Sequence, residues 1–117
     1  MRLTEITYGS ALAIESYGPG FFRVGTHVLR GPSLITPWDA GAWGGFEDMA
    51  GPLSLAGKID VLLVGLGAEV SVIPKAFRLA LEAQGIGVEP MNTPAACRSY
   101  NVLLGEGRRI AAALFVA

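Results

Sequence analysis

The segment Ile59–Gly67, IDVLLVGLG, restricts the fold of this chain more than any other stretch of its sequence. An unbroken apolar run follows Asp60 and ends at Gly65 and Gly67. A run that is short, apolar and bounded by glycines is typical of a strand buried on both faces, as in a parallel sheet. The segment therefore predicts a central strand covered by helices, which means an α/β fold.

The rest of the second half repeats the pattern of strand and helix. Pro74 suits the first position of a helix, and Thr93 suits an N-cap that is followed by Pro94 at the first helical position. The predicted elements are a strand over 59–64, a helix over 74–84, a strand over 86–89, a helix from 94 that stops at Gly105, and a strand over 109–116. This order predicts a central mixed, mostly parallel sheet with two helices.

The first half predicts an N-terminal antiparallel β layer. Gly18-Pro19-Gly20 and Gly31-Pro32 are strong turn signals between short β-prone runs. The predicted strands are a frayed edge strand at Thr4–Tyr8, two hairpin strands over 11–17 and 21–24, and short strands over 27–29 and 33–35.

The segment from Pro37 to Gly57 is rich in Gly and Pro, which leaves no room for a long regular element. We expect a loop there with one strand near Ala42–Phe46 and at most one helical turn around Leu53–Ala56. Residues 1–117 are then expected to form a single domain, in which 1–57 are mainly β and loops and 58–117 alternate strand and helix.

Composition limits the classes of function. The chain has 117 residues, of which 51% are hydrophobic and only 16% are charged, and its formal net charge is −1. A balance this close to neutral, without clustered Lys and Arg, argues against nucleic-acid binding. A small domain with few charges often covers part of its surface with a partner, so we expect docking on another protein or self-association.

The N-terminus and the single cysteine set the expected compartment. Cys97 alone cannot form an internal disulfide framework or a multi-cysteine metal site. No export signal is visible at the N-terminus, and no stretch reaches the ~20 apolar residues that cross a bilayer. We therefore expect a cytoplasmic protein that does not span a membrane.

The ends of the two predicted parallel strands form a candidate pocket. Free N–H groups between a buried strand and a helix favour phosphate or carboxylate, and open α/β sheets usually place ligands at this edge. The predicted pocket consists of Gly65, Gly67, Asn92, Thr93, Ala95 and Ala96. The alternative is structural, because a tight turn and a helix cap need these residue types without any ligand.

Other reactive residues supply no catalytic set, so we predict no catalytic residue, no metal site and no cofactor. His27 lies in a predicted strand and forms no triad or two-histidine metal spacing. Cys97 is near a helix start, where its pKa could fall, but a buried core cysteine is the more usual case. Asp39, Glu47 and Asp48 cannot be paired as general acid and base from their positions.

Two further groups allow both a functional and a structural interpretation. Trp38, Trp43 and Phe46 lie on an irregular segment, where aromatic side chains either fill the core or anchor a partner. Glu106, Arg108 and Arg109 are expected to form a solvated turn at the end of a helix, although one arginine could reach a carboxylate or a bound anion.

Three stretches carry a resemblance to a known family: FRVGTHVLRGPSLITPW, VLLVGLG and GIGVEPMNTPAACRSYNVLLGEGRRIAAALF. They resemble the small α/β family that includes mitochondrial respiratory complex I assembly factor three and many bacterial proteins of unassigned function. The residues that carry it most specifically are Thr93, Pro94, Ala96, Tyr100, Asn101, Leu104, Glu106, Gly107, Arg108 and Ala111–Leu114. Leu66 departs from the Gly-Thr-Gly that the family usually has after its central strand, and the pocket loses a hydroxyl.

The resemblance implies a mixed sheet with helices and an additional β layer. It also implies a role in respiratory complex assembly without an established enzyme activity. The leading hypothesis is therefore a non-enzymatic binding or assembly module that docks on a protein such as a respiratory complex component. The alternative is a small-molecule-binding protein, or an enzyme, that uses the pocket between Gly65–Gly67 and the Thr93 helix.

Overall fold

The computed structural model describes residues 11–68 and 72–117. In chain order the elements are β1 (Ile14–Gly18), β2 (Phe21–Val24), β3 (His27–Arg30), β4 (Ser33–Ile35), β5 (Ala40–Ala42), the 3-10 turn η1 (Gly45–Glu47), α2 (Ala50–Leu53), β6 (Val61–Leu66), α3 (Lys75–Glu82), β7 (Gly87–Met91), α4 (Thr93–Gly105) and β8 (Ile110–Phe115).

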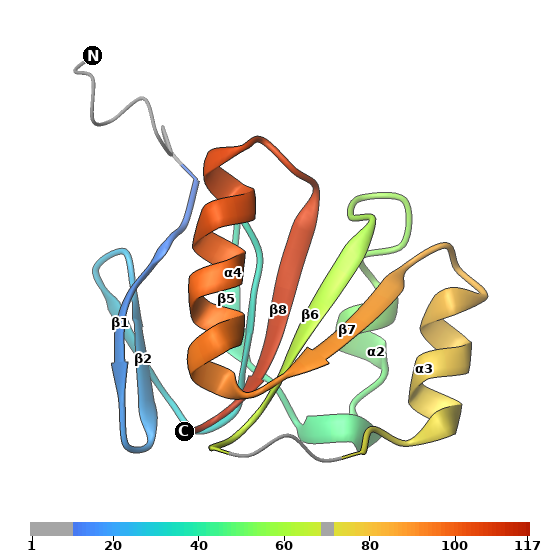
Figure 1. Ribbon diagram of the computed structural model, residues 1–117, viewed down its shortest axis with the longest axis horizontal. Helices are drawn as coiled ribbons and strands as arrows, with labels where there is room; N and C mark the ends of the chain where they lie inside the picture. Colours follow the sequence, from blue (N-terminus) through green and yellow to red (C-terminus); the bar gives the residue numbers. More distant parts are fainter. Residues whose placement is uncertain (1–10, 69–71) are drawn as a thin grey trace.

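The strands form two sheets. β1, β2 and β3 make an antiparallel three-stranded sheet, and the larger sheet has the order β5-β4-β8-β6-β7. In the larger sheet β6 runs parallel to both β8 and β7, whereas β4 runs antiparallel to β8 and β5. The predicted α/β fold with a mixed sheet and an antiparallel β layer is confirmed, and so is the parallel pairing of β6 with β7 (Figure 1).

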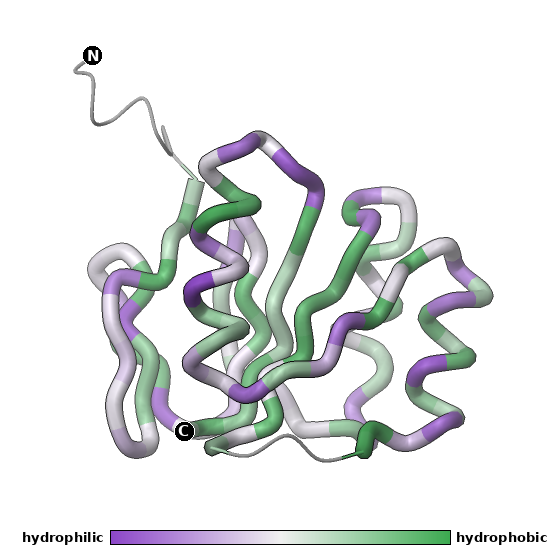
Figure 2. Tube along the Cα trace, in the orientation of Figure 1, coloured by the Kyte–Doolittle hydropathy of each residue, from purple (hydrophilic) through white to green (hydrophobic). Residues whose placement is uncertain are grey.

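The larger sheet is buried on both faces. Its central strand β8 alternates between two cores: Ile110, Ala112 and Leu114 face α4, while Ala111 and Ala113 face the core that α3 helps to form. Figure 2 shows β6 and β8 as hydrophobic stretches at the centre of the molecule. The alanines of β8 project little from the sheet, so α4 packs close to it on one side.

α4 also holds the small sheet. The Tyr100 hydroxyl is fully buried and donates to the carbonyl of Leu12 at 2.7 Å. The Asn101 amide accepts from the backbone N–H of Ile14 at 2.9 Å and donates to the carbonyl of the same residue at 2.8 Å. The β1–β2 hairpin therefore lies beside α4 (Figure 1), fixed by two adjacent helix residues.

The helix starts differ from the prediction. α3 covers Lys75–Glu82, and Pro74 is its extended N-cap instead of its first helical residue. Asn92, not Thr93, is the N-cap of α4, because its side-chain oxygen accepts from the N–H of Ala95 at 2.8 Å. Thr93 is the first residue of the helix, and its hydroxyl bonds elsewhere.

The middle loop also differs. β5 covers Ala40–Ala42, and Gly45, with a left-handed φ of +82°, begins the 3-10 turn that contains Phe46, so the strand predicted near Ala42–Phe46 lies earlier. The helical turn lies at Ala50–Leu53, earlier than expected. The strand predicted at Thr4–Tyr8 lies outside the described residues.

Candidate functional site

The predicted pocket residues meet where β6 ends against the start of α4. A Cβ on Gly65 would lie 2.9 Å from Thr93 Oγ1, 3.1 Å from Thr93 Cα and 2.8 Å from a methyl carbon of Leu114. Real Cβ atoms essentially never lie within 3.0 Å of another atom, and the 3.1 Å distance to the Thr93 backbone is tighter than nine in ten real Cβ contacts. Glycine is therefore needed at this position so that the helix can pack on the strand.

The polar groups of this corner bond to one another. Thr93 Oγ1 accepts from the N–H of Gly67 at 2.9 Å and donates to the carbonyl of Phe115 at 2.7 Å. The backbone N–H of Thr93 donates to the carbonyl of Gly67 at 2.8 Å. The N–H groups of Ala95 and Ala96 donate to the side chain and the carbonyl of Asn92. The contacts join β6, β8 and α4, and ligand binding at this corner stays a prediction.

The three aromatic residues predicted as a partner surface do not lie on one surface. Trp43 is only 3% exposed and donates its indole N–H to the carbonyl of Asp48 at 3.1 Å. Its ring centroid lies 5.8 Å from that of Phe46 and 5.1 Å from that of Phe115. Trp43 is thus part of the core, and the partly buried Phe46 packs against it.

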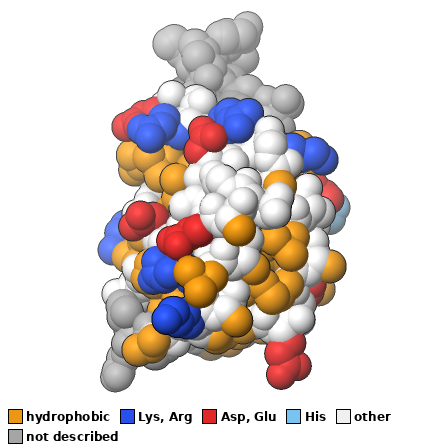
Figure 3. Space-filling view, turned by 90° about the vertical axis from the view of Figure 1, so that its right-hand side faces the viewer, with side chains coloured by type: hydrophobic (Ala, Val, Ile, Leu, Met, Phe, Trp, Pro, Cys, Tyr) orange, Lys and Arg blue, Asp and Glu red, His pale blue; other side chains and the backbone are white. Residues whose placement is uncertain are grey.

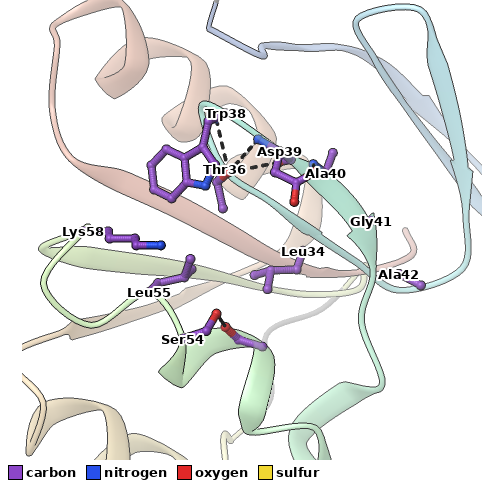
Figure 4. Close-up of a pocket in the computed structure, with 11 residues that line it drawn as sticks. Leu34, Thr36, Trp38, Asp39, Ala40, Gly41, Ala42, Ser54, Leu55 and Lys58 are labelled. Atoms are coloured by element: carbon purple, nitrogen blue, oxygen red, sulfur yellow. Dashed lines mark hydrogen bonds between the residues drawn. The ribbon is translucent and has the colours of Figure 1, made fainter.

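Trp38 is the member of this group that faces solvent, with 51% of its surface exposed. It lines a cleft of about 290 Å³ between the β4–β5 hairpin and the α2 region (Figure 4). The lining residues are Leu34, Thr36, Trp38, Asp39, Ala40, Gly41, Ala42, Gly51, Ser54, Leu55 and Lys58. Among the described residues that line the cleft, Lys58 is the only basic one.

A polar turn fixes the exposed tryptophan. Thr36 Oγ1 accepts from the backbone N–H groups of Trp38 at 3.2 Å and Asp39 at 2.8 Å, and it donates to the Asp39 carbonyl at 3.0 Å. Threonine three residues before an aspartate favours such a turn. The cleft was not predicted from the sequence, although the Thr36–Asp39 spacing before a short strand is a usable signal for the turn.

The reactive residues are dispersed and mostly structural. Burial raises the pKa of the Cys97 thiol to about 11, and the charge of Arg98 offsets this only in part. His27 is exposed on β3.

The Asp48 carboxylate accepts from the N–H groups of Gly44 at 3.0 Å and Gly51 at 3.2 Å and so shapes the middle loop. Within 11–68 and 72–117, no three His, Cys, Asp or Glu side chains gather in a way that could hold a metal ion.

The charged residues at the end of α4 form surface pairs. Arg109 binds the Asp60 carboxylate through two nitrogens at 3.1 and 3.3 Å, and Arg108 lies 3.9 Å from Glu106. Both pairs are exposed, which limits their contribution to stability. Figure 3 shows charges of both signs interspersed with apolar side chains on the face at the α3 end of the molecule.

Comparisons with known proteins place the chain among relatives over most of its length. It is 50% identical over 114 residues to an uncharacterized protein of Rhodobacter capsulatus, covering 97% of this chain and 92% of that protein. It is 32% identical over 108 residues to the NADH dehydrogenase [ubiquinone] 1 alpha subcomplex assembly factor 3 of Danio rerio, covering 86% of this chain and 62% of that protein. The human assembly factor 3 is 30% identical and is covered to 66%.

Solved structures agree in fold. A crystal structure of an outer membrane protein from Bartonella henselae has a TM-score of 0.82 and 35% identity, covering 93% of this chain and 98% of that one. An NMR structure from Bordetella pertussis, described as a Mth938-like domain, has a TM-score of 0.77 and 26% identity, covering 98% and 92%. In the part of the chain that the structure describes, none of the helices is long and apolar enough to span a membrane.

The model of one family, described as protein of unknown function (DUF498/DUF598), matches residues 14–115. This range extends from the first residue of β1 to the last residue of β8. The residues that carried the resemblance, such as Thr93, Tyr100 and Asn101, are those that join α4 to both sheets. The chain therefore belongs to the DUF498/DUF598 family, whose relatives include the complex I assembly factors 3 and bacterial proteins.

Proposed function

We propose that this chain is a non-enzymatic protein-binding module that acts in the assembly of a multi-subunit complex, as the names of its animal relatives state for those proteins. The chain spans 62% and 66% of the fish and human relatives, so their role extends to it only as a proposal. The candidate partner is a component of respiratory complex I. We propose a cytoplasmic location, which cell fractionation tests.

One observation carries this proposal beyond the names. Trp38 is held half exposed at the end of a cleft by a turn whose polar groups are satisfied internally. Tryptophans that border a concave surface are common anchors in protein interfaces. The predicted pocket at Gly65–Gly67 is less suited to binding, because its N–H groups already donate within the protein.

A matched pair of variants tests the role of Trp38. Trp38 and Leu79 are both 51% exposed, and they lie on the cleft and on α3 respectively. In the source organism, W38A is expected to lower the amount of intact NADH dehydrogenase complex on native gels and to weaken crosslinking of the tagged chain to its subunits. L79A is expected to change neither. Normal complex levels in a strain that lacks this chain, together with no crosslinked subunit, would contradict the proposal.

A further inference from the structure

The outer edge of β5 faces no other strand in the larger sheet, because β5 is the first strand in its order. The backbone N–H of Thr36 donates to the Asp39 carbonyl, and the backbone N–H of Trp43 donates to the Pro32 carbonyl. Inward-bonding residues alternate along an antiparallel strand, so Asp39, Gly41 and Trp43 bond toward β4. The backbone groups of Ala40 and Ala42 therefore point away from the sheet.

Two carboxylates hold the outward N–H groups at the ends of this edge. The N–H of Ala40 donates to Asp39 Oδ1 at 2.8 Å, and the N–H of Gly44 donates to Asp48 Oδ2 at 3.0 Å. Between them, the N–H of Ala42 and the carbonyls of Ala40 and Ala42 have no bond to a side chain of the described residues. Within residues 11–68 and 72–117, one donor and two acceptors at the centre of the edge are thus without a partner.

The opposite edge of the sheet is protected. In β7 every second residue, starting with Gly87, bonds to β6, and the Gly87 N–H donates to the Asp60 carbonyl. The backbone groups of Val88 and Pro90 therefore point away from the sheet. Pro90 has no N–H to donate, and Arg78 Nη1 donates to the Val88 carbonyl at 3.5 Å. Proline and covering charged side chains are usual devices against strand addition. β5 has neither at its centre.

The open edge borders the cleft. Gly41 has no side chain, and a Cβ built there would meet nothing within 4 Å, so the face of β5 that carries Leu34 of β4 beside it is open toward the cleft. Figure 4 shows the Lys58 side chain and the Trp38 indole at one end of the cleft and Ala40–Ala42 farther along it. A strand added at β5 would direct every second side chain to the face of the sheet on which this cleft lies.

We propose that an extended segment of a protein partner adds to the larger sheet along β5, with an acidic side chain of that segment paired with Lys58 and an apolar one packed on Trp38. Lys58 sets the preference for acid because it is the only basic residue among the described residues that line the cleft, and Asp39, the acidic residue of this lining, accepts from the Ala40 N–H at one end of the edge. This proposal rests on the proposed protein-binding function and specifies its surface and the chemistry of the partner.

An NMR titration tests it. The isotope-labelled chain is titrated with the blocked hexapeptide VTVDVT and with VTVKVT, in which lysine replaces the acid. VTVDVT is expected to shift the amide signals of Ala40–Ala42 and Lys58 and to leave Val88 unchanged. A42P removes the outward donor without removing a bond to β4, and it is expected to weaken binding about fivefold. K58E is expected to weaken the binding of VTVDVT and to strengthen the binding of VTVKVT. K75E, on α3, is expected to leave the binding of both peptides unchanged.

Three results would overturn the proposal. One is the absence of shifts at β5 with millimolar peptide, and another is equal binding of both peptides by the unaltered chain. The third is a dimer in sedimentation that A42P dissociates, which would assign the edge to a second copy. If W38A abolishes crosslinking to the partner while A42P and K58E leave it intact, strand addition fails and the protein-binding function stands.

Discussion

The Asn101 side chain forms two hydrogen bonds with the backbone of Ile14, one to its N–H and one to its carbonyl, although 87 positions separate the residues. The amide thus pairs with both backbone groups of Ile14, as the backbone of a neighbouring strand would, and this pairing attaches β1 to α4. Removing it leaves two backbone groups without partners at a partly buried position, a larger penalty than the loss of the bonds alone.

We expect N101A to lower the free energy of unfolding by about 2–3 kcal/mol. Hydrogen exchange is expected to accelerate at Ile14 before it does in β6, because the small sheet loses its attachment to the helix. N101D keeps the acceptor but places a carboxylate beside the Ile14 carbonyl, so it is expected to be at least as destabilising. R98A, on the exposed side of the same helix, serves as control. Unchanged exchange at Ile14 in N101A would contradict this role.

Thr93 joins three elements through its hydroxyl, and its side chain is fully buried. T93V has nearly the same shape but leaves the Gly67 N–H and the Phe115 carbonyl without their partner. We expect a loss of about 2–4 kcal/mol in urea denaturation. T93S retains the hydroxyl and is expected to lose less than half as much. Equal losses in the two variants would show that packing, not hydrogen bonding, dominates here.

Gly65 and Gly87 form a matched pair on adjacent strands. In G65A the new methyl group meets the backbone of Thr93, so α4 must move away from the sheet; in G87A the nearest atom is 3.6 Å away. We expect G65A to lose about 3 kcal/mol or more and G87A to lose under about 1 kcal/mol. Thermal unfolding of both variants measures this, and a G65A variant as stable as G87A would refute the close contact.

The buried Cys97 thiol gives stability a dependence on pH. Burial raises its pKa from 9.0 to about 11 in the folded chain. Between these values the unfolded chain releases the thiol proton and the folded chain retains it, so stability falls as pH rises from 9 to 11. The buried Tyr100 hydroxyl, whose pKa burial also raises, acts in the same direction at higher pH.

As pH rises from 9 to 11, we expect the free energy of unfolding to fall less in C97A than in the unaltered chain. Urea denaturation across this pH range measures the difference. The thiol is also expected to react slowly with a thiol-specific dye at neutral pH until the protein unfolds. Rapid labelling of the folded chain, or parallel pH profiles for the two proteins, would be inconsistent with a buried neutral thiol.

The alternative pocket has its own test. An anion at Gly65–Gly67 must compete with Thr93 for the Gly67 N–H and with Asn92 for the Ala95 N–H. We therefore expect titration with inorganic phosphate to leave the amide signals of Gly67 and Ala95 in place. Saturable shifts confined to these two residues would instead support the small-molecule hypothesis. T93S, which retains the hydroxyl group, would then serve as the control variant.

The sequence indicated that Gly65 and Gly67 lie beside Thr93, because the ends of adjacent parallel strands meet by topology, and a ligand pocket there stays a prediction. Their hydrogen bonds were not predictable, since Thr93 and Asn92 are both good N-caps and local sequence does not choose between them. The choice follows from the position of Phe115 and Gly67, which bond the Thr93 hydroxyl. The same limit applied to Trp38 and Trp43, because an irregular segment has no periodicity that shows which side chain faces inward.

The sequence by itself determined the buried strands, the two long helices and the glycines at their ends, because apolar periodicity and backbone preference act over a few neighbouring residues. The tertiary structure alone decided that Trp43 fills the core, that Trp38 borders a cleft and that β5 is an edge strand of the larger sheet. These features depend on contacts between residues far apart in the chain, such as Lys58 beside the β4–β5 hairpin. They exist only once the sheet has its order.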